Sequence, residues 1–426
     1  MLVHLPTTST QQVTPSTRRT CLSNGLTLIH QSLPTTATVV VDVWVRAGTR
    51  TEPDDWPGMA HFLEHMVFKG SPDIAPGEFD WLIENRGGMT NAATSHDYAH
   101  FFITVATEHL STVLPAFADI LLNAEISELE FERERDVVIE EIYSCQDDPD
   151  WLGFQALCES VYGSSPYGRS ILGTEQQIRQ RSPHQMRCFH RTHYQPENMT
   201  VAVVGDIDYH RALALVSEAF CNFPVRSECP HTSVQDLPPL DQIRRTTLQL
   251  PRLEQARLTL AWLAPGIEQL DQAIALDILS VILGGGRSSR LVRELREEQQ
   301  WVWDIDCEFS LQRDTSLFTI NAWLEMDQLE RVETTIVEHL QRLHHQGVQS
   351  GELARTQRLL TNEYAFSTET PAQIAGLYGY YQTIADATLA VEYPERIQAT
   401  TPEQLQAVAQ HYLSPDCYAV TTLKPM

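Results

Sequence analysis

Residues 61–65 read His-Phe-Leu-Glu-His, and these residue types at this spacing could hold a metal ion. On a helix, His61, Glu64 and His65 lie at positions i, i+3 and i+4, so their side chains share one face. The rest of the stretch from Met59 to Phe68 is mostly apolar, which predicts a buried helix whose polar stripe needs strong partners. Two imidazoles one turn apart, with a carboxylate between them, suit a zinc ion and a general base.

The order of these residues is the inverse of the common zinc-peptidase signature, which favours a metallopeptidase. Three fixed positions can also arise by chance in a chain with 16 histidines. In that simpler alternative, each histidine is a hydrogen-bonded or solvated residue, and Glu64 is an ion-pair partner. The motif alone leaves both interpretations open, so a third ligand has to be sought elsewhere in the chain.

The acidic segment that ends at Glu141 offers candidates for this third ligand. Helical spacing places Glu134, Val137, Val138 and Glu141 on one stripe, whereas Glu140 points away. Carboxylates on an apolar stripe need partners, because burial without one is costly. Glu141 is then the candidate third ligand, and Glu134 would orient it or a histidine. The alternative is a solvated helix whose acids pair with neighbouring arginines, and the sequence alone favours this for Glu134.

A two-domain α+β fold is expected to position these residues. A chain of 426 residues is too long for one core, so two domains of about 200 residues are expected. Strand-like and helix-like segments follow a similar order in both halves, and the proline-rich stretch 223–244 is predicted to be a linker. The predicted organisation is a flexible N-terminal extension (1–19), a zinc-binding domain (20–222), the linker, and a second domain (245–426).

Composition and charge narrow the class of protein. Hydrophobic residues make up 42% and charged residues 20% of the chain, as in folded globular proteins. The net charge of −26 argues against nucleic-acid binding and favours cationic partners or simply solubility, and an acidic solvated surface is the interpretation favoured for most of these carboxylates. No run of 18 apolar residues is present, so no membrane-spanning helix is expected. Scattered cysteines and the lack of a signal peptide favour a cytoplasmic location. Organellar import remains an alternative, because the acid-free first twenty residues contain Arg18 and Arg19.

The motif and the acidic segment together resemble the pitrilysin family of inverted-motif zinc peptidases, which includes mitochondrial processing peptidase and insulin-degrading enzyme. The match runs from His61-Phe-Leu-Glu-His-Met-Val-Phe-Lys-Gly70 to Glu-Arg-Asp-Val-Val-Ile-Glu-Glu141, and the similarity extends over nearly everything after residue 20. It is a similarity to the shorter members. The family's spacing selects Glu141 over Glu140 as the distal ligand. The resemblance implies two domains, each a mainly antiparallel sheet packed with helices, that form a clam-like chamber.

Roles for the metal-site residues follow from their chemistry and from this resemblance. His61, His65 and Glu141 would bind Zn²⁺. Glu64 would take a proton from the zinc-bound water and pass it to the leaving amine.

The segment that follows Gly87-Gly88 resembles the family's edge strand, to which a substrate adds as a further β-strand. Asn91, Ala92 and Ala93 would then bind the substrate, with Asn91 nearest to the scissile bond. The alternative is an ordinary strand that starts after a glycine turn.

In the second half, the glycine-rich stretch Leu283–Leu291 and the following Arg296 resemble a family loop and helix that reach the substrate. Members that are active alone pair this arginine with a tyrosine seven positions later, but Trp303 occupies that position here. An indole has no phenolic hydroxyl, so the pair is incomplete. Arg296 is expected to bind substrate, and a heterodimer with an arginine- and tyrosine-bearing subunit is expected over a homodimer.

The combined expectation is a zinc metalloendopeptidase that cleaves unfolded or short peptides, as the zinc-bearing subunit of a heteromer. Two alternatives remain, a non-catalytic structural subunit of the same fold and a zinc-dependent peptide-binding module. The first needs none of the zinc-site residues, so their presence argues against it, whereas Trp303 favours it.

Overall fold

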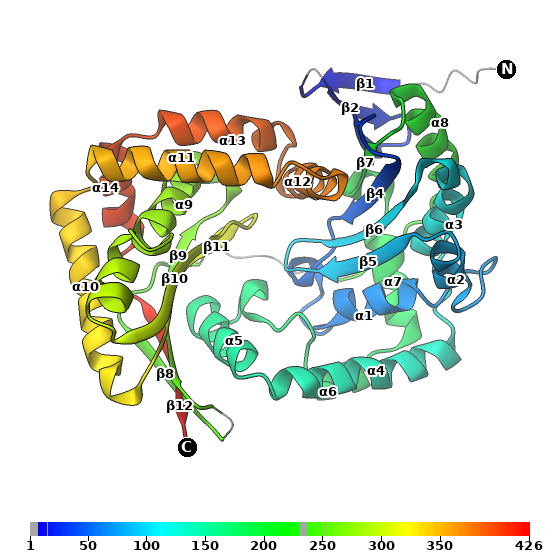
Figure 1. Ribbon diagram of the computed structural model, residues 1–426. Helices are drawn as coiled ribbons and strands as arrows, with labels where there is room; N and C mark the ends of the chain where they lie inside the picture. Colours follow the sequence, from blue (N-terminus) through cyan, green and yellow to red (C-terminus); the bar gives the residue numbers. More distant parts are fainter. Residues whose placement is uncertain (1–6, 15, 231–236, 252) are drawn as a thin grey trace. The chain divides into compact units, whose positions relative to one another are not determined.

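The computed structural model describes residues 7–14, 16–230, 237–251 and 253–426 (Figure 1). The chain divides into two compact units, and each unit combines three separate segments. Unit 1 comprises Met1–Tyr143, Ser170–Val234 and Ser367–Val391. Unit 2 comprises Ser144–Arg169, Gln235–Phe366 and Glu392–Met426. The predicted α+β fold class is confirmed, because each unit packs helices on a mainly antiparallel sheet.

Unit 1 is built on a seven-stranded sheet with the order β1-β2-β3-β7-β4-β6-β5, in which only β3 and β7 are parallel neighbours. Strand β4 (Thr38–Val45), in the interior of the sheet, is rich in β-branched residues and is buried after Thr38, as expected for a strand covered on both faces. The strands are β1 (Thr7–Gln12), β2 (Thr17–Leu22), β3 (Thr27–Ser32), β4 (Thr38–Val45), β5 (Met89–Thr94), β6 (Ala99–Ala106) and β7 (Met199–Gly205).

Helices cover both faces of this sheet (Figure 1). The helices that lie mainly in unit 1 are α1 (Met59–Val67), α2 (Glu78–Glu84), α3 (Leu110–Leu122), α4 (Glu128–Gln146), α6 (Glu175–Arg179), α7 (Pro183–His193), α8 (Tyr209–Ala219) and α12 (Pro371–Ile384). Only α12 comes from the second half of the chain, and it packs on β4 and β7 opposite to α3, α7 and α8.

Helix α12 is held on the sheet by apolar packing and by one arginine. Ile374, Ala375 and Tyr378 of the helix pack against a cluster of buried apolar residues from the sheet. Arg46, at the end of β4, donates to the carbonyl oxygens of Gln382 and Thr383, both at 3.0 Å. These carbonyls belong to the last turn of the helix, where a cation is favoured.

Unit 2 is built on a five-stranded sheet with the order β10-β11-β9-β12-β8, in which only β12 and β8 are parallel. The strands are β8 (Arg244–Leu250), β9 (Ala256–Pro265), β10 (Val302–Ser310), β11 (Thr315–Leu324) and β12 (Ala419–Pro425). The helices that lie mainly in unit 2 are α5 (Pro149–Tyr162), α9 (Leu270–Gly284), a π-helical turn (Val292–Glu298), α10 (Leu329–Gln346), α11 (Ser350–Phe366), α13 (Thr388–Ala399) and α14 (Pro402–Tyr412).

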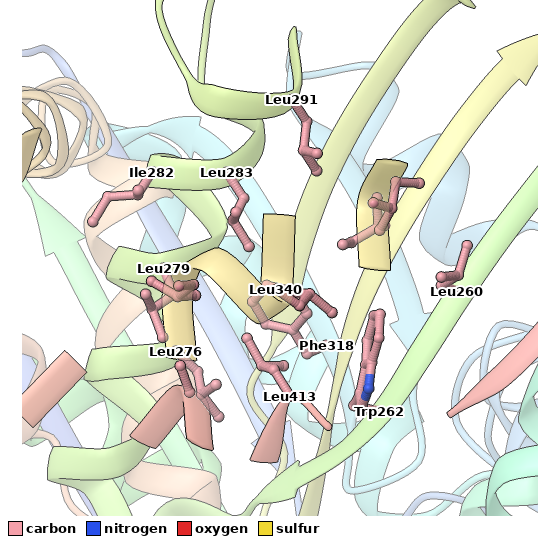
Figure 2. Packing of buried hydrophobic residues seen from close by; sticks show 14 of the residues in the cluster. Leu260, Trp262, Leu276, Leu279, Ile282, Leu283, Leu291, Phe318, Leu340 and Leu413 are labelled. Carbon is pink, nitrogen blue, oxygen red and sulfur yellow. The ribbon is translucent and has the colours of Figure 1, made fainter. Parts of the chain in front are cut away.

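The core of unit 2 lies between one face of this sheet and helices α9, α10 and α14. Figure 2 shows leucines of α9 and Leu340 of α10 converging on Phe318 and Trp262 of the sheet. The indole nitrogen of Trp262 donates to the carbonyl oxygen of Ser414 at 2.8 Å, so this large side chain is buried without an unpaired donor.

The units differ from the predicted contiguous domains in two exchanged segments. Helix α5, from the first half of the chain, packs on the sheet of unit 2, and α12 packs on the sheet of unit 1. Strand β1 lies inside the predicted N-terminal extension. Residues 1–6 and 15 of this extension and residues 231–236 of the predicted linker lie outside the described residues. Within the described residues, no helix combines the length and the apolarity needed to cross a membrane.

Candidate active site

Helix α1 carries the His-Phe-Leu-Glu-His motif, and the buried Glu52 fixes the start of the helix. Gly58, at its N-cap, has a left-handed φ of 80° and no side chain to cap the helix. The Glu52 carboxylate accepts hydrogen bonds from the backbone N–H groups of Gly58 at 3.1 Å and Ala60 at 2.8 Å. On the apolar side, Phe62 packs on Phe131 of α4, with ring centroids 4.6 Å apart. This packing fixes α4 beside α1.

The structure brings the three predicted metal ligands together. Oε2 of Glu141 lies 3.6 Å from Nε2 of His61 and 3.3 Å from Nε2 of His65. One donor atom from each of the three residues lies within 4.8 Å of the others. His61 is buried, whereas Glu141 keeps 40% of its side chain exposed. The donor set therefore converges at a point that solvent or a substrate can reach.

This donor set fits zinc. Zn²⁺ binds imidazole nitrogen at about 2.0–2.1 Å and carboxylate oxygen at about 2.0–2.2 Å, which separates tetrahedral ligand atoms by roughly 3.3–3.5 Å. The observed nitrogen–oxygen distances of 3.3 and 3.6 Å agree with this spacing. Three protein ligands of types N, N and O also match a catalytic zinc site that keeps its fourth position open.

Glu134 contacts the opposite ring nitrogen of one ligand. Its Oε1 lies 3.0 Å from Nδ1 of His65, and its Oε2 lies 2.7 Å from Nζ of Lys69. With 9% of its side chain exposed, Glu134 is a buried carboxylate with two partners. The exposed, solvated alternative for this residue is therefore excluded. The predicted stripe was wrong at Val137, which is 50% exposed, because the buried face of α4 runs through Phe131, Glu134 and Val138.

The electrostatics of this cluster shift the pKa values of the two histidines in opposite directions. Burial and the nearby charge of His65 lower the pKa of His61 to about 4. Burial also opposes the charge on His65, but hydrogen bonds to Glu134 and Glu141 outweigh it and raise the pKa of His65 to about 9. The hydrogen bond from His65 lowers the pKa of Glu141. Without metal the cluster thus favours a charged His65 with a proton on each ring nitrogen, and a cation would have to displace the proton on Nε2.

Glu64 lies on the same helix face but makes its hydrogen bond elsewhere. Its Oε2 accepts from Oγ1 of Thr94 at 2.6 Å, and Thr94 is the last residue of β5. Burial raises the pKa of Glu64, and the Thr94 hydrogen bond partly offsets this. A carboxylate with a raised pKa next to a metal-type donor set suits general acid–base chemistry.

Strand β5 is an edge strand of the unit 1 sheet, since β6 is its only neighbour among the described strands. Asn91 and Ala93 are exposed on it, and Ala92 is partly buried. The N–H of Ala92 donates to Oδ1 of Asn91 at 2.9 Å, so this backbone donor bonds a side chain of its own strand. The predicted substrate-binding residues therefore lie on an open edge that is tied to Glu64 through Thr94.

Arg296 lies in unit 2, in the π-helical turn, and pairs with two acids. Its Nη1 is 2.8 Å from Oδ1 of Asp304, and its Nη2 is 3.0 Å from Oε1 of Glu297. Trp303 is 62% exposed on the edge strand β10, at an irregularity in the pairing with β11.

Sequence reasoning missed three residues that support the site, Glu52, Lys69 and Thr94. The Glu52 carboxylate accepts hydrogen bonds from the start of α1, Lys69 forms an ion pair with Glu134, and Thr94 donates a hydrogen bond to Glu64. Lys69 follows the motif by one helical turn, which is a usable signal for a partner on the same side. Glu52 and Thr94 come from other segments, and their partners depend on the tertiary fold.

Comparisons with known proteins agree on one family. Residues 27–175 match the family model described as Insulinase (Peptidase family M16), and residues 182–360 match the one described as Peptidase M16 inactive domain. An uncharacterized zinc protease of Mycobacterium leprae is 30% identical over 415 residues, covering 96% of this chain and 91% of that protein. The uncharacterized zinc protease YmxG of Bacillus subtilis is 28% identical, covering 96% of this chain and 98% of that protein. A solved protease from Helicobacter pylori matches with a TM-score of 0.90 at 27% identity, covering 96% of this chain and all of that one.

The insulinase match contains all four residues of the candidate site, and the inactive-domain match spans most of unit 2. The predicted family is confirmed by these matches over nearly the whole chain. The chain belongs to the insulinase family of zinc peptidases, peptidase family M16.

Proposed function

We propose that this chain is a zinc metalloendopeptidase that cleaves unfolded or short peptides bound along β5. His61, His65 and Glu141 would hold the zinc ion, and Glu134 would orient His65. The observation that carries the proposal is the position of Glu64. Its helix neighbours His61 and His65 supply two of the three metal-type donors, while its own carboxylate is hydrogen-bonded to Thr94 at the end of the open edge strand.

Different parts of the site would perform different steps of peptide binding and cleavage. A bound zinc ion would supply Lewis-acid polarisation and a nucleophile at neutral pH. The open edge of β5 would bind the peptide main chain, which selects extended conformations rather than a particular sequence. Glu64 would accept the proton of the attacking water and deliver it to the leaving amine, a transfer for which its raised pKa suits it.

Replacing Glu64 with Gln tests this assignment. Glu64→Gln keeps the shape of the side chain but removes the base, so the rate of cleavage of a quenched peptide should fall by about 10²–10⁴-fold. Zinc content, measured by atomic emission, should stay equal to that of the parent chain. The matched control is Glu140→Gln, which removes an exposed carboxylate near the site and should leave both values unchanged. Unchanged turnover in Glu64→Gln would contradict the proposal.

We further propose that the chain acts as the zinc-bearing subunit of a heterodimer. This rests on Trp303, which stands where self-sufficient family members are expected to carry a tyrosine, and on Arg296, whose guanidinium pairs with Asp304 and Glu297. The peptide assay should therefore show higher turnover after co-purification with native partners than with the chain alone. Zinc without turnover in both preparations would instead favour a peptide-binding module, and lack of zinc would favour a structural subunit.

A further inference from the structure

Unit 2 contains a pocket that the proposed active site does not use. It has a volume of about 230 Å³ and lies between α5 and the sheet, and all of its lining residues belong to unit 2. Most lining positions on the strands, such as Thr259 on β9 and Thr421 on β12, alternate with core positions, so the pocket opens on the sheet face opposite to α9. Ligand pockets for small molecules commonly measure roughly 300–1,000 Å³, so this smaller one suits a single side chain.

The floor of the pocket is a polar row that crosses four strands. Asp306 of β10 pairs with Asn321 of β11, Asn321 pairs with Thr259 of β9, and Thr259 pairs with Thr421 of β12. The amide nitrogen of Asn321 donates to Oδ1 of Asp306 at 2.8 Å. Its amide oxygen remains as an acceptor. The row therefore offers acceptor atoms side by side on one face.

Thr421, at the inner end of the row, lacks a hydrogen-bond partner. The residue is 2% exposed, and its Oγ1 has no partner among the described residues. Buried hydroxyl groups are normally paired, and an unpaired one loses its water without compensation. Helix α5 packs tightly beside it, because a Cβ on Gly153 would come within 2.9 Å of Leu423. A donor group that enters this preformed pocket would satisfy the hydroxyl.

The charge of the pocket is negative. Three carboxylates line it, from Asp150, Asp306 and Glu308, against one guanidinium, from Arg257, which leaves two formal negative charges. Arg257 is already engaged, because its Nε is 3.2 Å from Asp150 and its guanidinium lies over the ring of Trp323 at 5.6 Å. The carboxylates of Asp306 and Glu308 therefore have no cation in the pocket.

The surroundings of Asp306 favour a positive ligand over an anion or a metal. Burial raises the pKa of Asp306, and the neighbouring carboxylates of Glu308 and Asp304 raise it further. A cation would relieve this repulsion. Among the described residues, the only compact donor set of three or more is the one at His61, so the carboxylates of this pocket do not form a three-ligand metal site. A planar, multi-donor cation can reach several spaced acceptors at once.

We infer that this pocket binds the guanidinium or ammonium group of a basic peptide side chain. The cationic head would contact Asp306 and Glu308 and donate to Thr421, and the aliphatic stem would lie along Trp323 and the exposed Phe154. The inference rests on the proposed peptidase function only for its choice of a peptide as the carrier of the cation. It assigns to unit 2 a preference for arginine- and lysine-containing peptides.

Two matched probes test the inference by binding, without turnover. N-acetyl-arginine methylamide and its citrulline counterpart have nearly the same shape, but only the first is charged. Each is titrated into the full chain carrying Glu64→Gln, with labelled threonine methyl groups followed by NMR. The Thr421 signal is assigned by its loss in Thr421→Val. The arginine probe should shift this signal saturably and bind at least about tenfold more tightly than the citrulline probe.

Charge variants complete the test. Glu308→Gln should weaken binding of the arginine probe by about tenfold, whereas Glu268→Gln, an exposed change outside the pocket, should not alter it. Equal affinities of the two probes, an unmoved Thr421 signal, or equal behaviour of the two variants would overturn the inference. Because binding is measured without hydrolysis, a chain that binds the probe but cuts no peptide, alone or with its native partners, would refute the proposed function and leave this inference standing.

Discussion

Glu134 and Glu141 lie two turns apart on α4, yet they contact opposite nitrogens of the same imidazole. Glu141 approaches Nε2 of His65 at 3.3 Å, and Glu134 lies 3.0 Å from Nδ1. Glu134 also pairs with Lys69, whose Nζ lies 2.7 Å from Oε2 of Glu134. A ring that is fixed at Nδ1 presents Nε2 in one direction, so Glu134 would control the geometry of a proposed zinc ligand without being one.

Replacing Glu134 with Gln should therefore weaken zinc binding without removing a ligand. Loss of such an orienting carboxylate commonly costs about 10–100-fold in metal affinity, and we expect that range for Glu134→Gln. Competition with a chromophoric chelator measures the dissociation constant. Glu140→Gln, which removes an exposed charge beside Glu141, is the control and should bind zinc as the parent does. If the two variants retain the same affinity, Glu134 has no role in orienting His65.

At the residue scale, the sequence was informative where one helix sets the geometry. The shared face of His61, Glu64 and His65 follows from helical periodicity alone. Helical periodicity and the family resemblance both chose Glu141 over Glu140, but the approach of Glu141 to the histidines depends on how α4 packs against α1. The hydrogen bond from Thr94 to Glu64 joins a strand to a helix, and no local pattern predicts such a contact.

At the element scale, the edge strand β5 gives a test of peptide binding by strand addition. The N–H of Ala92 bonds Oδ1 of Asn91, which indicates that it faces the open side of the strand. Ala92→Pro removes this N–H and puts the proline ring in its place. The fold should tolerate the change, because proline is accepted on the open side of an edge strand. We expect kcat/KM for a quenched peptide to fall at least about tenfold, with an unchanged circular dichroism spectrum. Ala92→Ser keeps the N–H and is the control, and equal activities of the two variants would exclude main-chain binding at this position.

Helix α12 gives a second test at this scale, through two of its glycines. A Cβ on Gly379 would overlap the indole of Trp44, whereas a Cβ on Gly376 would meet nothing within 4 Å. Gly379→Ala should lower the free energy of unfolding by about 1–3 kcal/mol, because the helix must move off the sheet. Gly376→Ala should raise it by about 0.5–1 kcal/mol, since alanine is the better helix former. Chemical denaturation measures both, and a stable Gly379→Ala would mean that α12 does not pack as described.

The element types were largely predictable, because each helix and strand carries its own periodicity. The β-branched run of β4 and the Ser182 and Pro183 pair that begins α7 are examples of such local signals. The membership of the elements in the two units was not predictable in the same way. Helices α5 and α12 each have an apolar side, but no local pattern says which of two sheets that side will cover.

At the scale of the whole molecule, the exchange of α5 and α12 makes the two halves of the chain depend on each other. The sheet of unit 1 presents Ile29, Val40, Ala202 and Val204 to segment 367–391, which is encoded after most of unit 2. Burial of an aliphatic side chain contributes about 1.5–3 kcal/mol, so loss of this cover removes a large part of a typical folding free energy. Unit 1 is therefore complete only when the second half of the chain is present.

Expression of residues 1–230 alone tests this dependence. The fragment contains the zinc-site residues and all seven strands of the unit 1 sheet but lacks α12, so the apolar face of the sheet would be exposed to water. We expect dye binding typical of exposed apolar surface, non-cooperative unfolding, and weakened zinc binding. Fusing segment 367–391 to this fragment through a flexible linker should restore cooperative unfolding, whereas a scrambled segment of the same composition should not. A fragment that unfolds cooperatively without the segment would show that α12 is dispensable, and the two halves would then fold as the contiguous domains that the sequence predicts.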